Sequence, residues 1–501
     1  MSTIRKQAIT SGILLYAGFA IGALNIYLYT KNGGFGEGEF GLTRVFFDFG
    51  QNIFSFASLG TIAVLYKFYP YYKDNLPKKE NDLLTWVFCA SAIGFVLVLI
   101  TGLIFQPFMI DYFGKSQGRQ LLAEYYLWVF PFGLGMLLFA ILEGFSWVLQ
   151  KTVMPNFLKE TGLRLFTTLL IALYYFKVID FTIFIYLFSF LFFAIAAILL
   201  VYLIRLGAFN ITFKISRVTK KFWKKMVWMQ LLMFSGTIIG AVGQTIDGIL
   251  IAGIKGLVAV EIFTLAQYLA NLVQVPQRSL QSISVGVLVQ AWKDKDEKEV
   301  FRVYKRSCIN MLIMSLFIYG NVVLNAADAI VVFGLKQNLL LGIDAMIILG
   351  LVRIIDAGTG VNGMVILTSK YWRFDFYSNI VMIVLIIPCN YFLIKQVGII
   401  GSAYAQLISF LVFNYIRFEF IRRKFNMQPF DSKTVLALFL TIVSFAIAYF
   451  TGKLLDGWLA IFVKAIIFSL VMIIGVFALK LTPDAWQLWE KWSAKWFKKV
   501  K

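Results

Sequence analysis

Fourteen apolar runs, each long enough to cross a lipid bilayer, are the feature that most constrains the fold of this chain. A helix needs about 20 apolar residues to span a hydrocarbon core of roughly 30 Å. A water-soluble core could not hide the apolar surface of 501 residues that are 60% hydrophobic and 15% charged. We therefore expect an all-α polytopic membrane protein. The predicted spans are 8–29, 42–66, 83–105, 121–147, 155–176, 181–204, 227–251, 258–289, 307–333, 343–368, 376–394, 399–418, 435–450 and 459–479.

The basic residues divide unevenly between the two sides of these spans. With the N-terminus inside, 32 of the 47 lysines and arginines fall in cytoplasmic segments, eight fall in outside loops and seven fall within spans. Because basic loops stay in the cytoplasm, this asymmetry predicts an even number of spans and two cytoplasmic termini. The net charge of +21 is spread over many short loops, which favours binding to anionic lipid headgroups over binding to nucleic acid.

The spans form two groups of six, followed by two more. A basic, amphipathic connector separates the two groups, and the tail places four tryptophans at helical spacing beside five lysines. Such a tail is typical of a helix that lies in the membrane interface. The predicted parts are an N-terminal six-helix lobe (1–206), a basic cytoplasmic connector (207–225), a C-terminal six-helix lobe (226–425), transmembrane helices 13 and 14 (426–480) and an interfacial amphipathic helix (481–501).

The composition argues against an enzyme. The chain has no histidine, which removes imidazole metal ligands and histidine-dependent catalytic triads. Its three cysteines, Cys89, Cys308 and Cys389, lie in distant spans without metal-ligand spacing. We find no nucleotide motif, and the short outside loops leave little room for a catalytic surface. We therefore expect no catalytic residue, no metal and no bound cofactor. The function classes that remain are translocation, channel formation and lipid scrambling.

Polar side chains follow one face of the second span of each six-helix group, at intervals of 4, 3, 4 and 3 residues. Charged groups at mid-bilayer are costly, so such faces are expected to meet water, substrate or each other. An aqueous cavity and a buried helix contact are both open interpretations. In the second case, Arg44 and Asp48 would neutralise each other. The two sets are Arg44, Asp48, Gln51, Ser55 and Ser58, and Gln267, Asn271, Gln274, Arg278 and Gln281.

Other intramembrane charges also occur at helical spacing. Glu160 precedes Arg164 by four residues, and Arg353 precedes Asp356 by three, which is typical of ion pairs. Both arginines lie far enough from a membrane surface to be cavity candidates.

Two carboxylates, Glu143 and Asp247, have no obvious partner within their own helices. A buried carboxylate without a partner can bind a proton or a cation, so both are candidates for H⁺ or Na⁺ coupling. The alternative is a partner on another helix. Pro131 and Pro276 are expected to kink spans four and eight.

Several segments resemble the polysaccharide and O-antigen flippases of the multidrug/oligosaccharidyl-lipid/polysaccharide exporter superfamily. The resemblance spans nearly the whole chain, and it combines loose motifs with the arrangement of six, six and two spans. The motifs are Gly33-Gly34-Phe35-Gly36-Glu37-Gly38-Glu39-Phe40, the exit of span two from Ser58-Leu59-Gly60 to Tyr69-Pro70, Pro155-Asn156-Phe157, Asp247-Gly248-Ile249-Leu250-Ile251 and Gln267-Tyr268-Leu269-Ala270.

The resemblance implies two pseudo-symmetric six-helix lobes plus two C-terminal helices, around a central cavity that alternately faces each side of the bacterial inner membrane. It implies transport of undecaprenyl-pyrophosphate-linked oligosaccharides for cell-surface polysaccharide biosynthesis. Partners would be the lipid-linked oligosaccharide, membrane lipids, a polysaccharide polymerase and glycosyltransferases. A cation-coupled multidrug antiporter and, less favoured, a membrane polysaccharide polymerase are the alternatives. The implied cavity residues are Arg44, Asp48, Gln51, Arg164, Gln267, Asn271, Gln274, Arg278, Arg353 and Asp356.

Overall fold

The structure, a computed structural model, describes residues 18–482 except 19, 114–118, 150, 152, 278–283, 285, 286, 289, 293 and 372. The described residues form helices and contain no β-strand, so the expected all-α architecture is confirmed. By their internal contacts the residues divide into two compact units, Met1–Glu261 (unit 1) and Ile262–Lys501 (unit 2). The C-terminal amphipathic helix predicted at 481–501 lies almost wholly outside the described residues.

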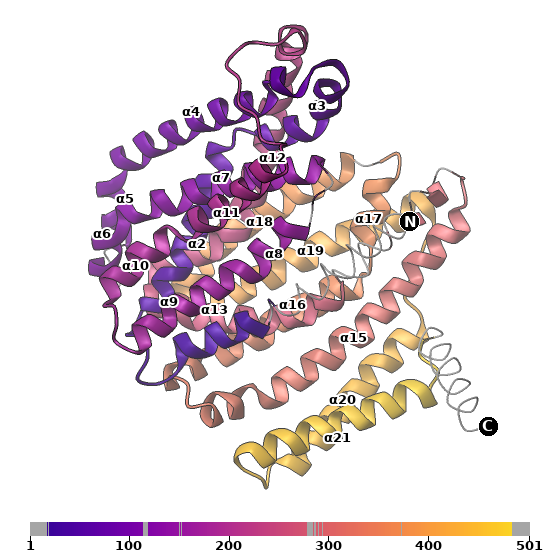
Figure 1. Ribbon diagram of the computed structural model, residues 1–501. Helices are drawn as coiled ribbons and strands as arrows, with labels where there is room; N and C mark the ends of the chain where they lie inside the picture. The colour runs from indigo at the N-terminus through magenta and orange to yellow at the C-terminus, as the bar shows by residue number, and fades with distance from the viewer. Residues whose placement is uncertain are drawn as a thin grey trace, which may run out of the picture. The chain divides into compact units, whose positions relative to one another are not determined.

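Unit 1 begins with helical residues 20–30 and ends in the first turn of α13 (Figure 1). Short 3₁₀ turns occur at η1 (Lys78–Glu80) and η2 (Tyr126–Trp128), and a π-helical turn, η3, covers Leu158–Gly162. The α-helices are α2 (Glu39–Ala57), α3 (Thr61–Asn75), α4 (Leu83–Ile104), α5 (Gln106–Phe113), α6 (Arg119–Tyr125), α7 (Val129–Val148), α8 (Val153–Phe157), α9 (Leu163–Tyr175), α10 (Phe181–Ser189), α11 (Leu191–Arg205), α12 (Arg217–Lys255) and α13 (Leu257–Asn271).

Unit 2 continues from α13 and ends with two antiparallel helices that pack against each other and against α15 (Figure 1). Two 3₁₀ turns, η4 (Leu272–Gln274) and η5 (Gln337–Gly342), precede longer helical segments. The α-helices are α15 (Glu297–Val332), α16 (Ile343–Gly358), α17 (Asn362–Thr368), α18 (Arg373–Val397), α19 (Ile399–Phe425), α20 (Ser432–Gly452) and α21 (Gly457–Ala478).

Ten helices in the described part of the chain are long and apolar enough to cross a membrane, and eleven if α2 and α3 are counted as one bent span. Large apolar side chains on α4, α20 and α21 face outward, as expected for helices that contact lipid. The chain is therefore a multi-pass membrane protein. The count of fourteen remains a prediction, and most of the first predicted span lies outside the described residues.

The second predicted span is not one straight helix, because α2 and α3 meet at an angle of 49°. Leu59 and Gly60 both have positive φ angles, which interrupt the helix. A Cβ atom at Gly60 would crowd the main-chain oxygen of Gln230 on α12, so glycine is needed at this bend. Hydropathy missed the bend because the residues on both sides of it are apolar.

The two prolines expected to kink spans each follow a short 3₁₀ turn. Pro131, in α7, lies three residues after the end of η2, and Pro276 lies two residues after the end of η4. A proline ring clashes with the carbonyl group four residues earlier, which is Leu127 in η2 and Leu272 in η4. The ring therefore accounts for the local change from α-helix to 3₁₀ geometry.

Aromatic rings fill the core of unit 1. Phe132 and Phe188 stack with ring centroids 5.4 Å apart, and Phe46 meets both rings edge to face. Stacked and edge-to-face ring pairs are favoured geometries, so these contacts stabilise the core in addition to the burial of large apolar surfaces. In unit 2 the core contains mainly aliphatic side chains, with Met311 on α15 and Met472 on α21 fully buried.

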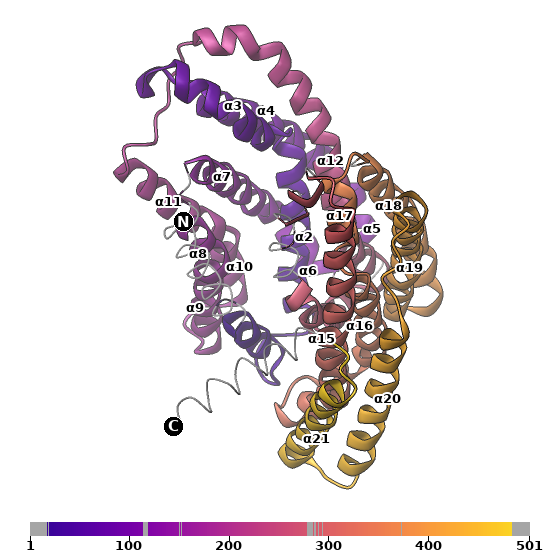
Figure 2. The ribbon, with the colours of Figure 1, turned by 90° about the vertical axis from the view of Figure 1, so that its right-hand side faces the viewer.

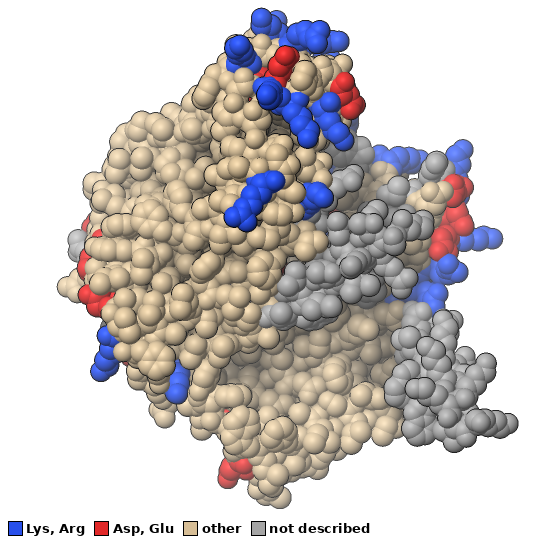
Figure 3. Space-filling model, viewed as in Figure 1, with Lys and Arg blue, Asp and Glu red and all other residues tan. Residues whose placement is uncertain are grey.

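Helix α12 is far longer than a membrane requires. Its 39 residues extend about 58 Å at about 1.5 Å per residue, against roughly 30 Å of hydrocarbon. Ser216 caps its first turn by accepting a hydrogen bond from the backbone of Thr219, so the second half of the predicted connector is helical. Figure 2 shows α12 as a long curved helix that begins beyond α3, and Figure 3 shows lysines and arginines gathered over this end of unit 1.

Candidate functional site

The predicted polar face of α2 carries an ion pair in unit 1. The guanidinium of Arg44 lies 3.4 Å from the Asp48 carboxylate, one helical turn away. The Asp48 side chain is buried, whereas the Arg44 side chain remains 35% exposed. Gln51 is half-buried, and Ser55 is buried. The two charges therefore neutralise each other, while Arg44 keeps surface through which it can meet a ligand.

A second carboxylate, Asp247 on α12, lies close enough to Asp48 for their charges to interact. The Asp48 Oδ2 atom lies against Gly248, where a Cβ atom would overlap it, and no hydrogen-bond partner for it occurs in the part of the chain that the structure describes. Asn52 ties the two helices together, since its Nδ2 atom donates to Thr245 Oγ1 at 2.7 Å. Two buried acidic side chains thus lie in the region where α2 packs on α12.

Glu143 has a partner on another segment of unit 1. Lys159 Nζ in the π-helical turn lies 3.1 Å from the Glu143 carboxylate. The partner on another helix, which the sequence left open, is therefore present for Glu143. Asp247 and Glu143 occupy different surroundings, and their role in ion coupling remains a prediction.

Arg164 forms the expected helical pair with Glu160, at 3.4 Å. Its main-chain oxygen accepts a hydrogen bond from Asn25 Nδ2 at 2.9 Å, so helical residues 20–30 pack against α9. The Arg164 side chain is 28% exposed. Arg164 follows the π-helical turn η3 closely in the chain, and such a distortion often marks functional sites. Arg44 and Arg164 are thus the partly accessible arginines among the predicted residues of unit 1.

Arg353 lies inside unit 2 and is only 9% exposed. Its Nε atom donates to Asn271 Oδ1 at 3.0 Å, and a terminal nitrogen donates to Gln406 Oε1 at 3.4 Å. The guanidinium also lies over the ring of Phe410, 5.6 Å from its centroid. These contacts fit a buried helix contact better than an open cavity wall.

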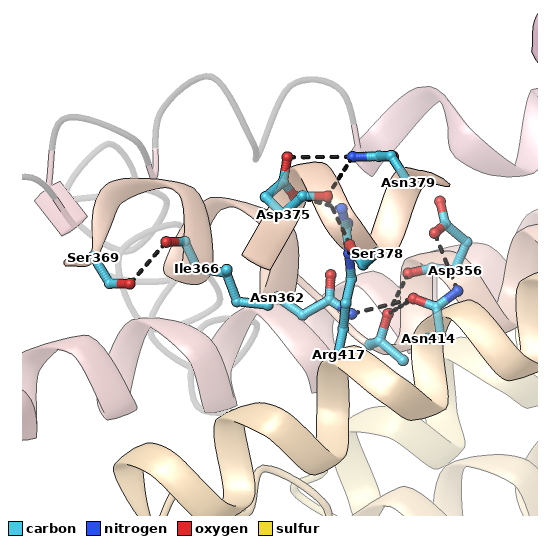
Figure 4. Close-up of polar contacts among 10 residues, drawn as sticks. Asp356, Asn362, Ile366, Ser369, Asp375, Ser378, Asn379, Asn414 and Arg417 are labelled. Carbon is cyan, nitrogen blue, oxygen red and sulfur yellow. Dashed lines mark hydrogen bonds and ion pairs between the residues drawn. The ribbon is translucent and has the colours of Figure 1, made fainter. Parts of the chain in front are cut away.

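Asp356 is held by amide side chains. Gln274 and Gln277 donate to its Oδ2 atom at 3.0 and 3.1 Å, and Asn414 donates to Oδ1 at 3.4 Å. Asn414 also accepts hydrogen bonds from Thr359 and Asn362, which lie on either side of the break between α16 and α17 (Figure 4). One side chain of α19 therefore bridges both halves of the predicted tenth span.

Arg417, one residue before the end of the predicted twelfth span, is a buried residue of α19. It pairs with Asp375 on α18, donates to Ser378 Oγ at 3.0 Å and lies 4.0 Å from the ring centroid of Phe413 (Figure 4). The spacing of Gln406, Asn414 and Arg417 along one face of span twelve could have revealed this network. Aromatic residues interleave with the polar ones there and hide the pattern.

The structure thus brings the predicted residues together in separate groups. In unit 2, Arg353 bonds to Asn271 and Gln406, whereas Asp356 accepts from Gln274, Gln277 and Asn414. Sequence reasoning missed Gln277, Gln406 and Asn414. Arg44, Asp48 and Asp247 meet in unit 1. Gln267 is half-buried on α13, and Arg278 lies outside the described residues.

No cluster of three or more acidic or cysteine side chains that could hold a metal ion occurs in the described ranges. The buried charges instead pair with one another or with amides. Such an arrangement, on helices that cross a membrane, defines a polytopic membrane protein with charged groups inside its helical units.

Solved structures of transporters share this fold. The lipid II flippase MurJ in its inward closed conformation superposes with a TM-score of 0.72 at 16% identity, over 94% of this chain and 99% of that one. An inward-facing multidrug resistance MATE family transporter of the MOP superfamily gives 0.63 at 14% identity, over 82% and 94%. A MATE structure in complex with MaL6 gives 0.54 at 15% identity, over 84% and 96%.

These comparisons show the fold alone, because the identities are low. No protein-family model matches the sequence, and no curated protein matches it. The chain has the fold that the MurJ flippase and the MATE transporter share.

Proposed function

We propose that this protein is a flippase for undecaprenyl-pyrophosphate-linked oligosaccharides in the bacterial inner membrane. It acts by alternating access during cell-surface polysaccharide biosynthesis, with both termini in the cytoplasm. It supplies a polysaccharide polymerase with the products of cytoplasmic glycosyltransferases.

The extent of the structural likeness is the observation that carries this proposal. The flippase superposes over 94% of this chain, whereas the inward-facing MATE transporter covers 82%. The difference corresponds to about the length of the predicted segment 426–480, which holds α20 and α21. A fold match that extends beyond the part shared with the MATE transporter supports a lipid-linked substrate over a drug.

The accessible arginines of unit 1 supply suitable chemistry. Arg44 and Arg164 are partly exposed and each is paired with one carboxylate. Arginine donates paired hydrogen bonds that match phosphate oxygens, so either residue can bind a pyrophosphate while its carboxylate partner keeps it in place. Transport is coupled to H⁺ or Na⁺, with Asp247 and Glu143 as the candidate coupling residues; Asp247 is the stronger candidate, because Lys159 already neutralises Glu143.

Reconstitution tests the proposal. Purified protein in proteoliposomes should move a fluorescent undecaprenyl-pyrophosphate oligosaccharide into the opposite leaflet, and an imposed proton or sodium gradient should change the rate. A transport rate that is unchanged by either gradient would support the flippase assignment and contradict the coupling to H⁺ or Na⁺. Absence of movement, with export of drug cations instead, would contradict the flippase assignment.

A cation-coupled multidrug antiporter is the second candidate. The observation in its favour is the pair of buried carboxylates where Asp48 on α2 faces α12 near Asp247. Acidic groups suit a cationic drug or a coupling ion, and they do not suit a pyrophosphate. Competition between a lipophilic cation and the lipid-linked oligosaccharide in the same vesicles would distinguish the two functions.

A further inference from the structure

Unit 1 contains a large apolar cavity that the polar residues described above do not touch. Its volume is about 520 Å³, and α2, α4, α5, α7 and α12 all contribute to its wall. Phe49, Ile53 and Phe56 line it from α2 at helical spacing, and Val98 faces them from α4. A concave site of this size is large enough to hold an apolar ligand.

The chemistry of the wall excludes a polar ligand. Among the described residues, no charged side chain lines the cavity, and Thr101 and Tyr126 carry its side-chain hydroxyls. The Thr101 hydroxyl donates to the Leu97 main-chain oxygen at 2.8 Å, and the Tyr126 hydroxyl donates to that of Gly102 at 2.9 Å. Both donors are therefore occupied within the wall. Apolar cavities without free polar groups stay dry and accept hydrocarbon ligands.

The volume suits a chain of hydrocarbon. An apolar cavity of about 150 Å³ accepts one benzene molecule, so this cavity has room for about twenty carbon atoms, or about four isoprene units. Leu97 and Phe105 line the cavity and are also 56% and 54% exposed. The cavity therefore opens onto the apolar outer surface of α4, and a longer chain can continue from it into the bilayer.

Helix α2 carries both the wall of this cavity and the predicted polar face. Phe49, Ile53 and Phe56 occupy one side of the helix, while Arg44, Asp48 and the rest of the polar face occupy another. An amphiphile with a charged head and a branched hydrocarbon tail could thus contact both sides of a single helix.

We propose that the cavity holds the isoprene units nearest the pyrophosphate of the lipid-linked substrate. This inference rests on the proposed flippase function and adds the position of the lipid tail, in unit 1 between α2 and α4. The head of the same molecule meets the polar face of α2, and the remaining tail follows the surface of α4.

Photolabelling tests the proposal on the full chain in nanodiscs. The probe is undecaprenyl phosphate with a photoreactive group in the isoprene units next to the phosphate, and mass spectrometry locates the label. We expect label on residues of α2 and α4 that line the cavity. Excess undecaprenyl phosphate should displace the probe, and dioleoyl phospholipid should not. Label confined to α20 and α21, or equal displacement by phospholipid, would overturn the proposal.

A pair of matched variants sharpens the test. V98W places an indole in the cavity, whereas V96W places one on the outer surface of α4, where Val96 is exposed and is not part of the wall. We expect V98W to weaken cavity labelling at least about tenfold, because a tenfold step in affinity corresponds to about two buried methylene groups. V96W should label like the native chain, and equal labelling of both variants would contradict the proposal.

Photolabelling and transport assays on the native protein separate this inference from the function on which it rests. Native protein that translocates the oligosaccharide but takes no label in the cavity would retain the flippase and refute the tail site. Cavity labelling without translocation would refute the flippase function. If V98W does not fold, V98F takes its place. The positions labelled on the native chain test the proposal without either variant.

Discussion

The charged side chains of the two units have different surroundings. In unit 2, Arg353 and Asp356 are enclosed by amide side chains, and Arg417 is enclosed by Asp375 and Ser378. In unit 1, Arg44 keeps exposed surface, and the Asp48 Oδ2 atom has no hydrogen-bond partner among the described residues. A network with satisfied partners holds a structure in place, whereas charged groups with spare capacity can exchange partners with a ligand. We infer that unit 2 is the more rigid of the two and that unit 1 carries more of the substrate contact.

The largest expected effect comes from breaking the network of unit 2. R417M removes one member of a buried ion pair and leaves the Asp375 carboxylate without that partner. We expect a loss of about 3 kcal/mol in the free energy of unfolding, measured in mixed micelles by denaturant titration. The matched control is R302M, because Arg302 is an exposed arginine of unit 2 whose pair with Glu299 lies at the surface. A loss of similar size in the control would contradict the comparison.

The arginine of unit 1 should show the opposite balance between stability and transport. R44Q removes the charge that would meet a pyrophosphate, and we expect the transport rate in proteoliposomes to fall roughly tenfold to a hundredfold, as for loss of a charge-assisted hydrogen bond. Because Arg44 is partly exposed, unfolding in the same micelles should change little. R44K keeps the charge and should recover part of the rate. Strong destabilisation without a specific transport defect would assign Arg44 to packing.

The two carboxylates proposed for coupling can be separated by their surroundings. D247N alters the acidic pair near Asp48, while E143Q alters a carboxylate that Lys159 already neutralises. We expect transport by D247N to lose its response to a proton or sodium gradient, and transport by E143Q to keep most of it. The measurement is the ratio of rates with and without the gradient. The reverse order would place coupling at Glu143.

The sequence was sufficient to predict the membrane helices because hydrophobic length is a local property. The predicted span 83–105 and the helix α4 (Leu83–Ile104) differ by one residue, and span twelve begins at Ile399 in both. The bend between α2 and α3 escaped prediction because it depends on the positive φ angles of Leu59 and Gly60, which hydropathy does not report.

The candidate site could be predicted only in part. Helical spacing found Asn271 and Gln274, since a polar face is visible along one helix. It could not reveal that Arg353 would meet Gln406, or that Glu143 would meet Lys159, because both contacts join different segments of the chain. Contacts between helices depend on tertiary packing, and the apolar cavity of unit 1 arises from the same packing.

The smallest expected effect concerns the surface of unit 2, at the junction of α19 and α20. Asp431 caps the first turn of α20 and lies 3.0 Å from Lys305 Nζ. Partial burial raises the pKa of the Asp431 carboxyl, but hydrogen bonds and the charge of Lys305 together outweigh it and hold the pKa below its ordinary value of 3.8. The ionised form is therefore favoured by folding.

A carboxyl whose pKa is lowered by folding contributes stability that is present above its ordinary pKa and is lost as the pH falls through the lowered value. The contribution of Asp431 should thus disappear at pH values below 3.8. We expect it to be below about 1 kcal/mol, because both side chains are partly exposed to solvent. D431N keeps a capping side chain without the charge, so the difference in unfolding free energy between D431N and the native chain should shrink on acidification. A difference that stays constant with pH would assign the effect to capping alone and would remove electrostatics from this part of unit 2.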